Sequence, residues 1–253
     1  MDMFAQLHLA AQYLATTAIS FLKKKEDDSH TNLSFSNTEK RLETRPLDKK
    51  GSKLGLDFPD FALQWISDEP RSLALHGKSH NEVVDWLKEV TTALDSSKAY
   101  NYRLHYQLPY AMGIYETFQM NNQKKMEQLI WLRILANQVL SEVLATNRLH
   151  SEVRIWPHHF DTGAFSPLNN SDVTIGLGLT IPDSLVADHY FYISGYCAHS
   201  GLDTSTFPKL SQGKWLNQRF KGAILPVTKT TDEKEATDFF NEAIHHYRKV
   251  AFK

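Results

Sequence analysis

The stretch VTIGLGLTI, residues 173–181, decides the class of fold. Its apolar side chains recur at every second residue, with threonine or glycine between them. A period of two is typical of a β-strand with one buried face, because successive side chains of a strand point to opposite faces. In such a strand, Gly176 and Gly178 allow another group to approach the backbone closely.

Strand-like and helix-like patterns alternate around this stretch. Helical spacing of apolar residues predicts helices over about 3–24 and 121–147. Two Ser/Thr-x-x-Glu capping boxes, which begin at Ser79 and Thr230, predict two more helices. Further strands are predicted over residues 31–35, 53–58, 61–66, 72–77, 100–110, 152–156, 189–197 and 222–227.

The order of these elements repeats along the chain. Helix, several strands and a capped helix follow one another in residues 3–95 and again in residues 121–252. Runs of strands between helices favour an α+β fold with antiparallel sheets and flanking helices, here as a duplicated helix–strands–helix unit. We assign residues 1–110 to the first α/β repeat unit and residues 111–253 to the second. The two units form either one compact domain with a continuous sheet or two packed domains.

Composition excludes several classes of protein. The 253 residues carry 28 basic and 29 acidic side chains, so no excess of positive charge is available to bind nucleic acid. Cys197 is the single cysteine, which rules out an internal disulfide and suits a reducing compartment. Gln6, His8 and Gln12 interrupt the apolar N-terminal run, which indicates neither a signal peptide nor a membrane span. We expect a cytoplasmic protein without a membrane partner.

The segment WPHHFDTG, residues 156–163, is the strongest candidate for a functional site. In an extended chain, His159 and Asp161 share one face, and imidazole with carboxylate suits a divalent metal or acid–base catalysis. His199, in the later loop CAHSGLD, is the expected donor from elsewhere. The candidate metal-binding or ligand-binding residues are therefore His158, His159, Asp161 and His199, with Trp156, Asp203 and Trp215 in support.

A structural interpretation of the same segment stays open. In it Trp156 and Phe160 are core residues, the histidines bond to backbone carbonyls, and Asp161 caps a turn. The protein would then be a non-catalytic scaffold or interaction protein. Tyrosines also alternate within residues 100–110 and 190–196, and they line either a ligand cleft or an aromatic sheet face under a helix.

Three segments carry a resemblance to a known family. WPHHFDTG, the later YFYISGY, and SQGKWLNQRF followed by KGAILP resemble, in this order, segments of a family of uncharacterised bacterial proteins. The resemblance covers the second half of the chain, whereas the first half is similar in layout only. It implies that residues 154–163 and 213–226 act as a unit, and it implies no reaction. We therefore expect a small-ligand-binding or metal-binding protein, with hydrolysis as the activity to test.

Overall fold

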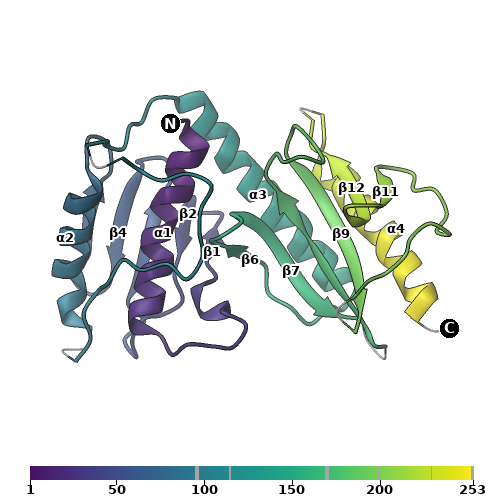
Figure 1. Ribbon diagram of the computed structural model, residues 1–253, viewed down its shortest axis with the longest axis horizontal. Helices are drawn as coiled ribbons and strands as arrows, with labels where there is room; N and C mark the ends of the chain where they lie inside the picture. Colours follow the sequence, from purple (N-terminus) through teal and green to yellow (C-terminus); the bar gives the residue numbers. More distant parts are fainter. Residues whose placement is uncertain (95–96, 114, 169–170, 199, 229, 252–253) are drawn as a thin grey trace. The chain divides into compact units, whose positions relative to one another are not determined.

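The computed structural model describes residues 1–94, 97–113, 115–168, 171–198, 200–228 and 230–251 (Figure 1). The chain divides into two compact units. Unit 1 contains Met1–Ile134 and Ile155–His159, and unit 2 contains Leu135–Arg154 and Phe160–Lys253. The predicted repeat boundary between residues 110 and 111 stays a prediction.

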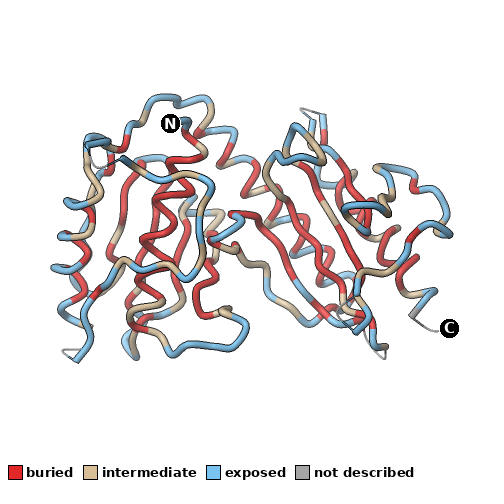
Figure 2. The backbone as a smooth tube through the Cα atoms, in the orientation of Figure 1, coloured by how far each residue is buried: buried red, intermediate tan, exposed pale blue. Residues whose placement is uncertain are grey.

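Unit 1 is built on a five-stranded antiparallel sheet with the strands in chain order. Its elements are α1 (Met3–Phe21), the short 3-10 helix η1 (Ser29–Thr31), β1 (Ser34–Ser36), β2 (Arg41–Glu43), β3 (Lys53–Asp57), β4 (Ala62–Ile66), β5 (Arg71–Ala74), α2 (His80–Val90) and the 3-10 helix η2 (Thr91–Ala93). Helix α1 contacts β3 and is buried along most of its length (Figure 2). The buried leucines Leu42, Leu56 and Leu63 lie opposite one another on adjacent strands and form one row of the core.

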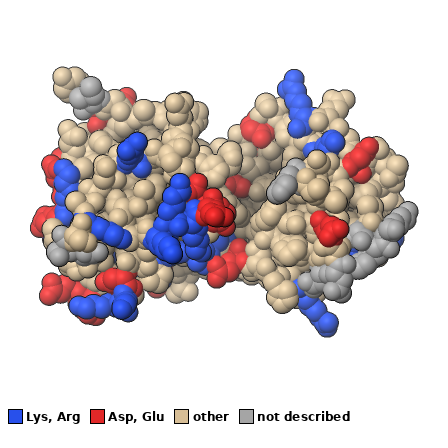
Figure 3. Space-filling view, turned by 60° about the horizontal axis from the view of Figure 1, so that its bottom comes forward, with Lys and Arg blue, Asp and Glu red and all other residues tan. Residues whose placement is uncertain are grey.

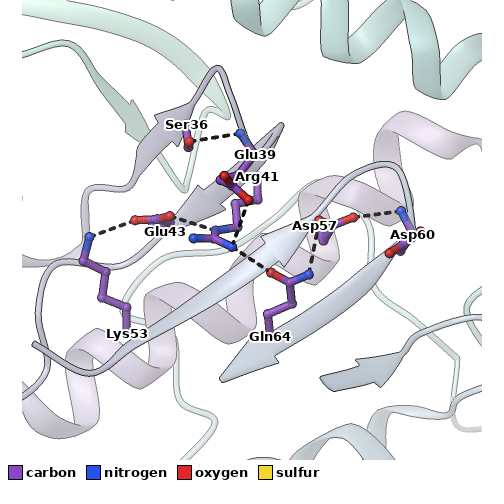
Figure 4. A network of polar contacts seen from close by, with 8 residues as sticks. All are labelled: Ser36, Glu39, Arg41, Glu43, Lys53, Asp57, Asp60 and Gln64. Atoms are coloured by element: carbon purple, nitrogen blue, oxygen red, sulfur yellow. Dashed lines mark hydrogen bonds and ion pairs between the residues drawn. The ribbon is translucent and has the colours of Figure 1, made fainter. Parts of the chain in front are cut away.

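The other face of this sheet carries a polar network (Figure 4). Glu43 accepts hydrogen bonds of 2.8 Å from both Arg41 and Lys53, and Arg41 donates to Gln64, which in turn donates to Asp57. Burial raises the pKa of Glu43, but the hydrogen bonds from Lys53 and Arg41 outweigh burial, and the pKa lies below its usual value. Such cross-strand pairs are what an antiparallel sheet needs on a face without apolar packing.

Unit 2 contains the second antiparallel sheet, of seven strands, except for Ile155 and Trp156 of its first strand, which belong to unit 1. The order is β11-β12-β9-β8-β7-β6, with β10 beside β9. The strands are β6 (Arg154–Trp156), β7 (Asp161–Pro167), β8 (Val173–Thr180), β9 (Tyr190–Cys197), β10 (Ser200–Gly201), β11 (Lys214–Asn217) and β12 (Lys221–Pro226). Helix α3 (Gln123–Thr146) precedes them and crosses the boundary between the units, and α4 (Glu233–Ala251) follows them and contacts β9 and β12.

The glycines of β8 lie under aromatic rings. A Cβ atom at Gly178 would lie 2.6 Å from the carbonyl oxygen of Thr162 and 2.9 Å from the ring of Tyr192. A Cβ atom at Gly176 would meet nothing closer than 3.4 Å, at the ring of Phe165. The predicted close approach is therefore confirmed at Gly178, where the neighbours are both backbone and ring.

The predicted α+β class with antiparallel sheets is confirmed, and the two sheet-plus-helix halves are compatible with a duplication. In both halves the first two strands are joined by a four-residue turn, residues 37–40 and 157–160. Each turn ends in a non-glycine residue with a left-handed backbone, Lys40 (φ 52°) and Phe160 (φ 58°). The turn places WPHHFDTG at the corner between β6 and β7, the position that residues 37–40 hold between β1 and β2.

The two predicted capping boxes and the predicted strand over residues 100–110 have different outcomes. The capping box of Ser79 and Glu82 is confirmed at the start of α2. The capping box at Thr230 is wrong, because α4 begins at Glu233 and Asp232 accepts the hydrogen bond from the backbone N–H of Glu235. The strand predicted over residues 100–110 is also wrong, since these residues pair with no strand.

By length and composition, α3 is the one helix of the described chain that qualifies as a candidate membrane span. Half of its apolar window is buried within the protein, and core helices of soluble proteins pass the same test. Arg133, in the middle of the helix, is also buried.

Candidate functional site

The segment WPHHFD forms the turn between β6 and β7. Pro157 and Phe160 are buried, whereas His158 and His159 are exposed. The two imidazole rings lie 4.2 Å apart between centroids. Although the residue as a whole is exposed, partial desolvation of its ring and the neighbouring His159 lower the pKa of His158 to about 4, so His158 is neutral at pH 7.

The carbonyl group of Pro157 is fixed on α1. His8 Nε2 donates to it at 2.7 Å and Gln12 Nε2 donates to it at 3.0 Å. Because a carbonyl oxygen only accepts, His8 carries its proton on Nε2, and Nδ1 accepts from the hydroxyl of Tyr110. The turn is thus anchored through its backbone. The corner interpretation places such bonds on His158 and His159, so this anchor differs from it and the interpretation stays a prediction.

The candidate metal ligands do not form a group within the described residues. Asp161 is a buried residue of unit 2, where it accepts a 2.7 Å hydrogen bond from the hydroxyl of Tyr192, while His158 and His159 belong to unit 1. His199 lies outside the described residues. Among the residues that are described, no group of three or more His, Cys, Asp and Glu side chains is placed to hold a metal ion. The metal site stays a prediction.

The supporting residues have local structural roles. Trp156 is half-buried in β6. Asp203 is exposed and accepts from the backbone N–H of Ser205, which lowers the pKa of its carboxyl group. Trp215 donates from Nε1 to the carbonyl of Pro208 at 3.0 Å and packs edge-on against Phe207.

A different set of residues comes together on α1. His8, Gln12, Thr16 and Ser20 follow one another at steps of four and form one polar stripe on the helix. Residues 100–113, which we call the strap, run along this stripe in the opposite direction (Figure 1).

Each residue of the polar stripe bonds to the strap. Tyr106 donates to Gln12 at 2.6 Å, the hydroxyls of Tyr100 and Thr16 lie 2.9 Å apart, and the N–H of Asn101 donates to Ser20 at 3.1 Å. The fourth contact is the hydrogen bond between the hydroxyl of Tyr110 and His8. Along the strap, even-numbered residues are buried or half-buried, and the odd-numbered residues are exposed. The alternation predicted as a strand therefore belongs to an extended segment held by side chains.

A pocket lies between the strap, α1 and the start of α2. It has a volume of about 410 Å³ and is lined mainly by apolar and aromatic side chains. The lining residues are Leu9, Tyr13, His80, Tyr102, Leu104, Gln107, Leu108, Tyr110, Ala111, Met112 and Phe118. Volume and lining are those of a site for a small organic molecule, which usually occupies roughly 300–1,000 Å³.

His80 is the titratable side chain at the centre of this wall. The hydroxyl of Tyr13 and His80 Nδ1 share a hydrogen bond of 3.0 Å, and Tyr102 meets the imidazole edge-on at 4.6 Å between centroids. Burial lowers the pKa of His80. Among the described residues, neither His80 Nε2 nor the Tyr102 hydroxyl has a hydrogen-bond partner, which leaves both polar groups available to a ligand.

The stability of the protein should depend on the protonation of His8. Burial, assisted by the positive charge of Arg133, lowers the pKa of His8 from 6.5 to about 4, although the bond to Pro157 opposes the shift. Below pH 6.5 the unfolded chain gains a proton that the folded protein does not accept until about pH 4. His8 alone should therefore lower the free energy of unfolding by about 2 kcal/mol between pH 7 and pH 5.

Urea unfolding of the wild type and of His8→Gln at pH 7, 6 and 5 measures this contribution. The variant should lose less stability on acidification than the wild type, by about 2 kcal/mol. Identical pH dependence in the two proteins would show that His8 is not buried in its neutral form.

Comparison with known proteins gives no match, whether with family models, with curated proteins or with solved structures. The resemblance to the bacterial family therefore stays a prediction, and the function has to be argued from the geometry alone.

The sequence indicated two of the residues that line the pocket. The alternating tyrosines were predicted to line either a cleft or a sheet face, and Tyr102 and Tyr110 do line the pocket. Tyr13 and His80 were missed as partners because 67 residues separate them. The sequence does contain a pattern that indicates this contact. Polar residues recur at steps of four in α1, and tyrosines recur along residues 100–110, which bond to them.

Proposed function

We propose that this protein binds a small organic molecule in the pocket between the strap and α1. The observation that carries the proposal is an apolar pocket of about 410 Å³ whose wall, the strap, is held on α1 by a series of side-chain hydrogen bonds. Protein pockets for small molecules are largely preformed and apolar, with few polar groups that orient the ligand. The pocket has both properties.

A larger pocket of about 490 Å³ lies elsewhere in unit 1 and supports the proposal less well. Its lining is mainly polar, and two of its acidic groups, Asp48 and Glu89, are already engaged. Asp48 accepts from the backbone and hydroxyl of Ser52, and Glu89 forms an ion pair with Arg71 at 2.8 Å.

In this proposal WPHHFDTG has a structural role, and the protein is a cytoplasmic binding protein. The anchored carbonyl of Pro157 and the recurring hairpin turn support that role. No nucleic-acid or membrane partner is included, because the net charge is −1 and basic groups lie beside acidic groups on the face drawn in Figure 3. A metal-dependent hydrolase centred on His158, His159, Asp161 and His199 remains the alternative.

Prodan, an uncharged naphthalene ketone whose fluorescence reports an apolar environment, is a suitable probe of the pocket. The wild type should bind prodan saturably at one site. Ala111→Trp places an indole at an exposed position of the pocket lining, so it should weaken binding at least tenfold without disturbing the core. Fluorescence titration measures both affinities.

Ala99→Trp is the matched control, because it makes the same change at an exposed alanine that does not line this pocket. Its affinity for prodan should equal that of the wild type. Absence of saturable binding to the wild type, or equal weakening by both tryptophans, would contradict the proposal.

A further inference from the structure

We propose that the pocket selects an uncharged, flat molecule that carries a hydrogen-bond acceptor, and that His80 Nε2 is the donor that recognises the acceptor. This inference rests on the proposed function and adds the chemical class of the ligand. It follows from the charge of the lining, the tautomer of His80 and the orientation of the rings.

The lining determines the charge of the ligand. Its residues include no aspartate, glutamate, lysine or arginine. A charged group that left water for this lining would lose hydration without gaining a partner of opposite charge, which is strongly unfavourable. An uncharged ligand has no such cost, and the apolar side chains Leu9, Leu104 and Leu108 favour it.

The hydrogen bond from Tyr13 determines the tautomer of His80. We assign the Tyr13 hydroxyl as the donor in this bond, because a phenol O–H donates more strongly than a neutral imidazole N–H, and an imidazole nitrogen accepts more strongly than a phenol oxygen. Nδ1 of a neutral imidazole that accepts this bond has no proton, so the proton is on Nε2. The lowered pKa of His80 and its place in the first turn of α2 both favour the neutral ring. Nε2 is therefore a fixed donor.

The rings around His80 favour a flat ligand. Tyr13 and His80 are stacked, with 25° between their planes and 5.8 Å between their centroids. Tyr102 stands nearly perpendicular to His80, at 78°. Together these rings form a wall with one planar face and one edge, against which a planar conjugated molecule packs better than a branched one. The free hydroxyl group of Tyr102 supplies a second polar contact.

Two uncharged probes of similar size separate acceptor recognition from apolar binding. Prodan carries a ketone acceptor, whereas N-phenyl-1-naphthylamine has no comparable acceptor. His80→Phe removes the donor and keeps an aromatic ring, so it should weaken prodan binding about tenfold, as the loss of one hydrogen bond of ~1.4 kcal/mol requires. Binding of N-phenyl-1-naphthylamine should change less than threefold. His80→Gln, which keeps an N–H donor, should recover most of the prodan affinity.

The outcomes separate this inference from the proposed function. If the wild type and His80→Phe bind both probes equally well, the pocket is a binding site but His80 is not its donor, and the inference is overturned. If the wild type binds neither probe, the proposed function itself fails. Circular dichroism and the midpoint of thermal unfolding verify that each variant is folded.

Discussion

Replacing Gln12 by alanine should lower the free energy of unfolding by about 4 kcal/mol. The side chain of Gln12 is fully buried. Its amide donates to the carbonyls of His8 and Pro157, and it accepts from the hydroxyl of Tyr106. The substitution therefore leaves a cavity and removes one hydrogen bond from each of three polar groups, of which the Pro157 carbonyl keeps its bond from His8. Denaturant unfolding measures the loss.

Two variants separate the hydrogen bonds from the cavity. Tyr106→Phe removes one bond to Gln12 without a cavity and should cost about 1–2 kcal/mol. In a double-mutant cycle with Gln12→Ala, the two losses should be less than additive, because the variants share that bond. Gln107→Ala, at an exposed glutamine of the strap, should cost less than ~0.5 kcal/mol. If Gln12→Ala and Gln107→Ala lowered the free energy of unfolding equally, the polar stripe would not stabilise the protein as described.

Gly178→Ala should destabilise the protein by about 3 kcal/mol. The added methyl group would lie 2.6 Å from the backbone oxygen of Thr162, which belongs to the adjacent strand and cannot move without breaking the sheet. It would also displace the ring of Tyr192 and with it the hydrogen bond to Asp161. Thermal or denaturant unfolding gives the magnitude.

Gly176→Ala is the matched control in the same strand. Its methyl group would meet neighbours only at 3.4 Å or more, which is ordinary van der Waals contact, so the cost should stay below ~1 kcal/mol. If both alanines cost the same, the close contacts with Thr162 and Tyr192 would not be the reason for the glycine at position 178.

The fold could be predicted where the local sequence pattern favours the same structure as the segment's pairing and packing in the folded protein. VTIGLGLTI has the period of a strand; β8 pairs with β7 and β9 along its two edges, and its alternating apolar side chains are buried. Strand β7 was missed because Asp161, Gly163 and Pro167 are poor strand residues, and its pairing with β8 overrides that preference. The strap shows the reverse case. Its alternation identifies an extended chain, but the pattern cannot distinguish a sheet neighbour from a helix that binds its side chains.

The candidate site was predicted less completely, because the residues that line the pocket are far apart in the sequence. WPHHFDTG is conspicuous because its chemistry is concentrated in a few consecutive residues, yet its turn is held through the carbonyl of Pro157. The pocket draws on α1, α2 and the strap, so no single stretch of sequence contains it. His8 and Gln12 were noticed only as interruptions of an apolar run, although their four-residue step is the signature of a helix stripe with a polar partner.

The central claim is that the pocket under the strap is the ligand site, and the methionine methyl groups test it most directly. Met112 lines the pocket, whereas Met126 is buried in α3 and does not line it. In a methyl NMR spectrum of protein labelled with ¹³C-methionine, the signal lost in Met112→Leu identifies Met112, and Met126→Leu identifies Met126. Addition of prodan should shift the Met112 signal progressively and leave the Met126 signal in place. Bound prodan with an unchanged Met112 signal would contradict the account.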